Sequence, residues 1–195
     1  MRFAIAATLL GSFALAGCQP PAADSYEGRA DPPDTTSHAS EPQASPNAEG
    51  AVWAPSEKPL RLLYGIPGQQ PFAAIACEMG GDEGEEALLR ITRFARADEG
   101  AQALMALIGN GHKERVGVEA VDNGRAFLWE GTLPLASEKL DVLTGQRKVE
   151  LTIPGAGTLA LNASEAPRDL IEGCRLAVRK RSPGSEPQDR SPSAE

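Results

Sequence analysis

The chain has 195 residues, of which 41% are hydrophobic and 5% aromatic, and its formal net charge is −8. Lysine and arginine form no stripe along any predicted face, so the electrostatic footprint of a nucleic-acid-binding protein is missing and no nucleic-acid partner is expected. Once the segments predicted to lie outside a fold are set aside, roughly 120 residues remain, which is enough for one hydrophobic core and therefore for one domain.

Residues 1–17 have the pattern of a secretory signal peptide. An apolar run of about 14 residues, Phe3 to Ala16, follows the basic residue Arg2 and ends in small residues. Two alternatives are open. An uncleaved membrane anchor would need roughly 20 apolar residues, and this run is shorter. An ordinary signal peptide cleaved near Ala16 would have no need of the cysteine that follows.

The end of this run, Leu15-Ala16-Gly17-Cys18, resembles the lipobox of bacterial lipoproteins. The resemblance implies that the chain is cleaved before Cys18 and that Cys18 receives the lipid, which tethers the protein to a membrane by acyl chains such as palmitate. Gln19 stands where enterobacterial lipoproteins retained in the inner membrane carry aspartate. We therefore expect an outer-membrane lipoprotein that faces the periplasm.

Residues 18–59 are predicted to be a lipidated N-terminus followed by a disordered linker. The segment is rich in proline, among serine, alanine and acidic residues, and such a composition buries too little apolar surface to offset the entropy of ordering. Its prolines keep it extended, so it should act as a semi-rigid spacer. Trp53 is its one large apolar residue and is expected where the linker meets the domain. The polar tail, residues 179–195, is also predicted to be disordered.

Residues 60–178 are predicted to form a mainly β domain, an antiparallel sandwich or small barrel of seven to eight strands with one C-terminal helix. The clearest strand is Lys148 to Ile153, where apolar and polar residues alternate. Asn110-Gly111 predicts a two-residue hairpin turn. Residues 140–143 fit either a strand or a short helix. The predicted strands are residues 60–64, 72–78, 88–94, 104–108, 114–121, 126–131, 148–153 and about 159–161.

The C-terminal helix is expected to begin near Ser164, a good N-cap residue. Leu170 and Cys174 are four residues apart and therefore share one helix face. The chain has three cysteines. If lipidation uses Cys18, then Cys77 and Cys174 remain as one pair in an oxidising compartment. We therefore expect a disulfide that joins the second predicted strand to this helix.

A cysteine motif on an early strand, Ile75-Ala76-Cys77-Glu78, is followed late in the chain by a series of short motifs that ends in Cys-Arg. These later motifs are residues 141–143, 149–151, 154–155, 159–161 and 170–175. Together they resemble a group of small alphaproteobacterial periplasmic lipoproteins of unknown function. The resemblance covers about residues 72–176. It favours the fold and the cysteine pair and implies no activity.

Few residues of the chain point to chemistry at a metal. A loop with four carboxylates has the ligand type that hard cations prefer. It lacks the alternating spacing of a calcium-binding loop, so we predict that it is a solvated turn. Two cysteines and two histidines spread along the chain do not have the spacing of a zinc site. No metal site and no cofactor are therefore expected. The loop carboxylates are Asp82, Glu83, Glu85 and Glu86.

Nucleophilic catalysis would need a serine or cysteine beside a histidine and an orienting acid. His112 is the one histidine in the predicted domain, and it lies in a predicted turn where Glu114 or Asp122 are its nearest candidate partners. No nucleophile is flanked by a base, so the domain is not expected to be an enzyme. A deep pocket that holds two of Glu78, Glu130 and His112 within hydrogen-bond reach, together with turnover of an envelope substrate that is lost when they are replaced, would overturn this expectation.

These features predict a membrane-tethered periplasmic lipoprotein whose β domain is non-catalytic and binds an envelope protein or contributes to envelope structure. The alternative is an inhibitor or ligand carrier similar to lysozyme-inhibitor β barrels, although the Ser-Gly-rich inhibitory loop of those proteins is not found in this sequence. An envelope enzyme is the third choice.

Overall fold

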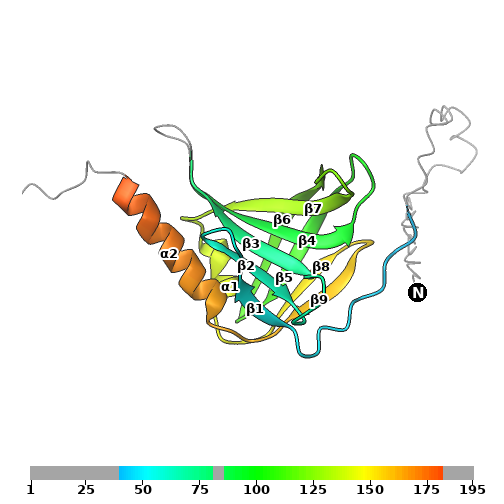
Figure 1. Ribbon diagram of the computed structural model, residues 1–195, viewed down its shortest axis with the longest axis horizontal. Helices are drawn as coiled ribbons and strands as arrows, with labels where there is room; N and C mark the ends of the chain where they lie inside the picture. The colour runs from blue at the N-terminus through cyan, green and yellow to red at the C-terminus, as the bar shows by residue number, and fades with distance from the viewer. Residues whose placement is uncertain (1–39, 81–85, 182–195) are drawn as a thin grey trace, which may run out of the picture. The chain divides into compact units, whose positions relative to one another are not determined.

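The structure, a computed structural model, describes residues 40–80 and 86–181. In these residues nine antiparallel strands form one sheet, which rolls into a nearly closed barrel, and one long helix follows at the C-terminus (Figure 1). The predicted fold class is confirmed, with one strand more than expected, and the sheet takes the barrel-like form of the two that were predicted. The strands are β1 (Val52–Pro55), β2 (Arg61–Gly65), β3 (Ala73–Glu78), β4 (Leu88–Arg96), β5 (Gln102–Gly109), β6 (His112–Asp122), β7 (Phe127–Pro134), β8 (Val149–Ile153) and β9 (Gly157–Leu161), and the helices are η2 (Glu138–Leu140), α1 (Asp141–Thr144) and α2 (Ala166–Arg181).

The order of the strands in the sheet is β1-β2-β3-β4-β7-β6-β5-β8-β9. The first four strands follow one another as a meander. The β5–β6 hairpin is then inserted so that β7 pairs with both β4 and β6, while β8 pairs with the far side of β5. The two non-local pairs, β4 with β7 and β5 with β8, set which outward-facing side chains become neighbours.

The hairpin turn between β5 and β6 follows the prediction from Asn110-Gly111. Both residues have positive φ, 51° and 86°, as a two-residue turn of this kind requires. Asn110 also fixes the neighbouring segment, because its side-chain amide donates to the carbonyl oxygen of Val142 and accepts from the amide of Arg147, each at 2.8 Å. A Cβ at Gly145 would lie 2.1 Å from the Asn110 side chain, so the close approach requires glycine there.

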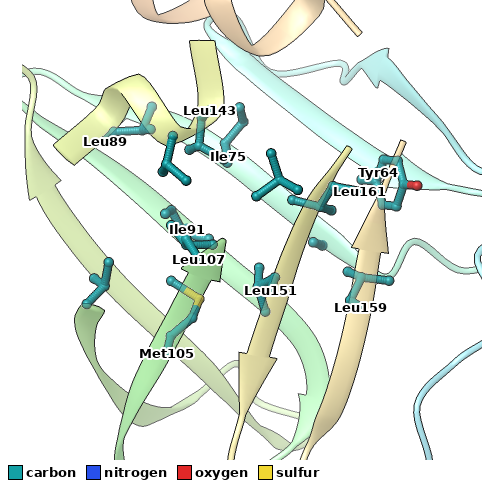
Figure 2. Close-up of a cluster of buried hydrophobic side chains, with 14 of the residues drawn as sticks. Tyr64, Ile75, Leu89, Ile91, Met105, Leu107, Leu143, Leu151, Leu159 and Leu161 are labelled. Carbon is teal, nitrogen blue, oxygen red and sulfur yellow. The ribbon is translucent and has the colours of Figure 1, made fainter. Parts of the chain in front are cut away.

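Apolar side chains from all parts of the sheet fill the barrel (Figure 2). The alternation predicted for the strand that begins at Lys148 is confirmed, since its apolar residues are buried and its polar residues face outward. The segment over residues 140–143 is helical, and Leu143 from α1 packs over the end of the barrel near Leu89. Side chains that are almost fully buried include Tyr64, Ile75, Leu89, Met105, Leu107, Leu151, Ile153 and Leu159.

The predicted boundary between linker and domain at residue 60 is wrong, because the described residues from 40 onward pack on the barrel. Gln43 donates its backbone amide to the carbonyl of Gly155 and its side-chain amide to the carbonyl of Arg96. Backbone hydrogen bonds to the turn and edge of a sheet stabilise such a proline-rich stretch without a large apolar contribution of its own. β1, which includes Trp53, pairs with β2. At the other end α2 continues to Arg181, three residues beyond the predicted end of the domain.

The two edge regions of the sheet, at β1 and β9, are connected by hydrogen bonds of Tyr64 on β2 and of Asn162 after β9, along a line that we call the seam. The hydroxyl of Tyr64 donates to the carbonyl of Ala160 and accepts from the amide of Asn162, both at 2.8 Å. The side chain of Asn162 in turn donates to the carbonyls of Ala51, at 2.9 Å, and Ala48, at 3.2 Å. Tyr64 is fully buried, and this burial raises the pKa of its phenol.

Replacing Tyr64 by Phe should destabilise the protein by about 1 kcal/mol, because two partly buried hydrogen bonds to the backbone are lost. The urea midpoint at pH 7 measures this loss. The raised pKa means that the phenol ionises first in the unfolded state. The wild type should therefore lose stability as the pH rises through about 10. The difference in unfolding free energy between the wild type and Tyr64→Phe should become smaller in that pH range. An equal difference at pH 7 and pH 11 would contradict the role given to the hydroxyl.

The predicted disulfide is confirmed. Cys77 near the end of β3 bonds to Cys174 on α2, with the two Cα atoms 6.1 Å apart in space and the two residues 97 positions apart in sequence. Cys174 and its helix neighbour Ile171 are fully buried, and Leu170 is 9% exposed. The bond therefore fastens the buried face of α2 to the end of the barrel that α1 also covers (Figure 1).

Replacing both Cys77 and Cys174 by Ala should lower the free energy of unfolding by about 2–4 kcal/mol, since a closed loop of this length restricts the unfolded chain strongly. Urea unfolding without reductant measures the change, and adding reductant to the wild type should reproduce it. A double variant as stable as the oxidised wild type would show that packing alone holds α2.

Candidate functional site

Among the described residues, the middle of the barrel is filled by side chains that are buried to within a few per cent. Tyr64 and Leu159 occupy the region beneath the seam, and Leu107 and Leu151 occupy the middle (Figure 2). A carried molecule would have to displace these residues at the cost of their burial. A binding surface is therefore better sought on the outside of the sheet.

The outer face of the sheet carries a hollow of about 610 Å³ that crosses five neighbouring strands, β3, β4, β7, β6 and β5. Half of the residues in its lining are polar or charged, and the other half are apolar residues or glycine. The residues that line it are Glu78, Leu88, Arg90, Gln102, Ala103, Leu104, Gly117, Val118, Glu119, Glu130, Gly131 and Thr132.

Two glycines shape this hollow. Gly117 lies on β6 between the inward-facing residues Val116 and Val118, and a Cβ built on it would meet no atom within 4 Å. The missing side chain therefore leaves open space on the outer face. On β7 a Cβ at Gly131 would lie 2.6 Å from the carbonyl oxygen of Gly117, so Gly131 lets the two strands approach one another below the hollow.

An arginine flanked by two glutamates occupies one side of the hollow. Arg90 on β4 forms ion pairs with Glu78 from β3 and with Glu130 from β7. The Glu130 carboxylate also accepts a hydrogen bond of 3.0 Å from the hydroxyl of Thr92. The Glu78 carboxylate, and after it that of Glu130, raises the pKa of the Arg90 guanidinium above its usual value. Three strands are thus joined by side chains on their outer face.

The hollow as a whole carries an excess of negative charge. Its lining holds three carboxylates, with Glu119 as the third, against the single guanidinium of Arg90. In the pairing of β6 with β7, Glu119 lies directly opposite Glu130. Like charges directly opposite one another across two strands are unfavourable, so a cation beside this pair would relieve the repulsion. Leu104 borders the same hollow and is 59% exposed.

The predicted candidates for chemistry come together only in part. Glu78 and Glu130 line the same hollow, where Arg90 separates them. His112 is the exposed first residue of β6 and does not line it. No described hydrogen bond joins His112 to Asp122, which lies at the opposite end of the eleven-residue strand and accepts from the backbone of the next turn. Cys18 and the loop carboxylates Asp82, Glu83 and Glu85 lie outside the described residues, whereas Glu86 is exposed.

No local sequence pattern indicates the importance of Arg90. Its outward position follows from the alternation of its strand, but which carboxylates would lie beside it depends on the pairing of β4 with β7. These strands are separated by a whole hairpin, and no local pattern specifies their register.

Comparison of the chain with protein-family models, with curated proteins and with solved structures found no match. Within residues 40–80 and 86–181, no helix is long and apolar enough to cross a membrane. The same residues hold no group of three or more histidine, cysteine or acidic side chains placed to bind a metal ion.

Proposed function

We propose that this protein is a lipoprotein tethered to the periplasmic side of the outer membrane through Cys18. We further propose that its β domain binds an envelope protein through the hollow on the outer face of the sheet. The observation that carries the tether is the bond between Cys77 and Cys174. It accounts for two of the three cysteines, and disulfides persist in oxidising compartments such as the periplasm. The third cysteine then stands where the lipobox resemblance requires it.

Replacing Cys18 by Ala should abolish incorporation of labelled palmitate and leave a precursor that keeps residues 1–17. The control is the variant in which Cys77 and Cys174 are both Ala, which should still be lipidated because the lipobox is intact. Mass spectrometry of the N-terminus and fractionation of the two membranes measure both results. Normal processing and outer-membrane recovery of Cys18→Ala would refute the proposal.

The partner that fits the hollow presents a lysine or arginine next to an apolar side chain. A cation entering beside Glu119 and Glu130 would meet two carboxylates that face one another, and an apolar neighbour would cover the exposed side chain of Leu104. Complementary charge of this kind favours association and partner choice. The filled interior supports binding on the outside of the barrel in preference to the alternative of an internal ligand carrier.

The same geometry supports a non-catalytic role. Glu78 and Glu130 both accept from Arg90, and Thr92 holds Glu130 from a second side. Acid–base catalysis needs a side chain placed to exchange a proton with a substrate, whereas these carboxylates are engaged in an ion-pair network that joins β3, β4 and β7. His112, the residue best suited to proton transfer near neutral pH, does not line the hollow.

Partner binding can be tested with a photoreactive benzophenone amino acid placed at one of two exposed leucines of the full-length protein in intact cells. Leu104 borders the hollow and is 59% exposed, whereas Leu176 lies on α2 and is 50% exposed. A defined cross-linked species should form from position 104 and not from position 176. Increased salt should weaken it, because exposed charges are screened.

The cross-link from position 104 should disappear when Gly117→Val fills the hollow. Valine suits a strand, and the open space at Gly117 lets the protein fold. Lys113→Val, on the same strand and face but outside the lining, serves as the matched control and should leave the cross-link intact. Equal cross-linking by both variants would exclude the hollow as the binding surface.

A further inference from the structure

Arg93 is a buried cation inside the barrel. It follows Leu89 and Ile91 along the inward face of β4 and is 5% exposed. Its Nη1 donates to the carbonyl of Phe72 at 2.8 Å, while its Nε is buried without an acceptor. No ion pair in the described residues includes Arg93, in contrast to Arg90 on the same strand. Burial lowers the pKa of the Arg93 guanidinium, and a buried charge without a counter-charge is costly.

The residue directly opposite Arg93 also has a buried N–H donor without an acceptor. Trp129 on β7 is its partner in the strand register, so both side chains stand on the inner face of the sheet. The indole Nε1 of Trp129 is buried and has no acceptor, and the residue is 7% exposed. A cation and two N–H donors without acceptors therefore lie on adjacent strands. Native proteins satisfy almost all buried donors, so this pair calls for a ligand.

A β-bulge lies beside this pair. Arg93 pairs with Trp129, but the next pair along the two strands is Arg96 with Leu128, so β4 carries extra residues at this point. Bulges at barrel rims re-aim side chains and are frequent next to functional sites. The bulge lies at the end of β4 remote from α1, and Gln43 of the N-terminal segment donates to the carbonyl of Arg96. Arg93 and Trp129 are 5% and 7% exposed, but the unpartnered atoms Arg93 Nε and Trp129 Nε1 are themselves buried, so a ligand reaches them only if neighbouring side chains move.

We propose that Arg93 and Trp129 form a receptor for one carboxylate group of a small anionic ligand. Nη1 of Arg93 is engaged by Phe72, and the opposite edge of the guanidinium, formed by Nε and Nη2, presents two parallel N–H groups. This fork matches the two oxygens of a carboxylate, and the Trp129 indole supplies a third donor. Ala73 and Ala120, the other register partners of Arg93 and Trp129, are small and leave the two long side chains uncrowded. This site faces the interior and is independent of the outer hollow.

The test uses full-length protein in detergent with 15N-labelled tryptophan, and acetate, inorganic phosphate and chloride as probes at matched ionic strength. The chain has two tryptophans, so the indole resonance of Trp53, which packs on Tyr64, is an internal control. Acetate should shift the Trp129 indole resonance saturably and leave that of Trp53 in place. A larger response to phosphate than to acetate would overturn the carboxylate assignment. Equal responses to all three salts, or none, would overturn the site.

Two variants distinguish recognition of acetate by the paired N–H groups of the guanidinium, the fork, from recognition by its positive charge alone. Arg93→Met should abolish the acetate response and should raise the urea midpoint in acetate-free buffer, because it removes a buried charge while keeping a long side chain. Arg93→Lys keeps the charge without the fork and should weaken acetate binding at least tenfold. If Arg93→Met fails to fold, Trp129→Phe provides a second readout, since acetate should then raise its melting temperature less than that of the wild type. An unchanged acetate response in Arg93→Lys would overturn the assignment of the fork.

Discussion

Closure of the sheet along the seam between β1 and β9 is the constraint on which the rest of the structure depends. An open antiparallel sheet exposes two rows of unpaired backbone groups. Here hydrogen bonds of Tyr64 and Asn162 connect the two edge regions, and further hydrogen bonds from residues 43–48 add to this connection. Residues 40–59, which composition predicts to be linker, therefore contribute to closure through backbone contacts that composition does not reveal.

Closure also decides where binding can occur. The barrel is narrow enough for its own side chains to fill it, and Met105, Leu107 and Leu151 leave the middle without evident free space. Larger barrels can enclose ligands because their lumen exceeds the reach of their side chains. In this domain, recognition is left to the outer face and to the rim. The outer face is hollowed where β6 lacks a side chain at Gly117, and β4 carries a bulge between Arg93 and Arg96.

The local elements were predictable from the sequence, and the non-local ones were not. Asn110-Gly111 specified its turn because positive φ at two successive positions strongly favours these residue types. The strand over residues 149–153 followed from strict alternation, and the cysteine pair followed from counting. The pairing of β4 with β7 depends on tertiary packing, so neither the ion pairs of Arg90 nor the partner of Arg93 could be read beforehand. A single signal was available: Arg93 falls at an inward position of its strand, where a charge is unusual.

Arg90 and Arg93 lie on the same strand, but they face opposite sides of the sheet and therefore have different surroundings. The two positions differ by an odd number, so one arginine faces outward and the other inward. On the outer face, where water also stabilises a charged group, Arg90 forms ion pairs with two carboxylates. Inside, where an unbalanced charge costs more, Arg93 has a single carbonyl. A counter-charge near position 93, or an apolar residue at that position, would cost less than an unpaired buried guanidinium. The under-satisfied guanidinium beside an under-satisfied indole is therefore the feature on which the proposed carboxylate site rests.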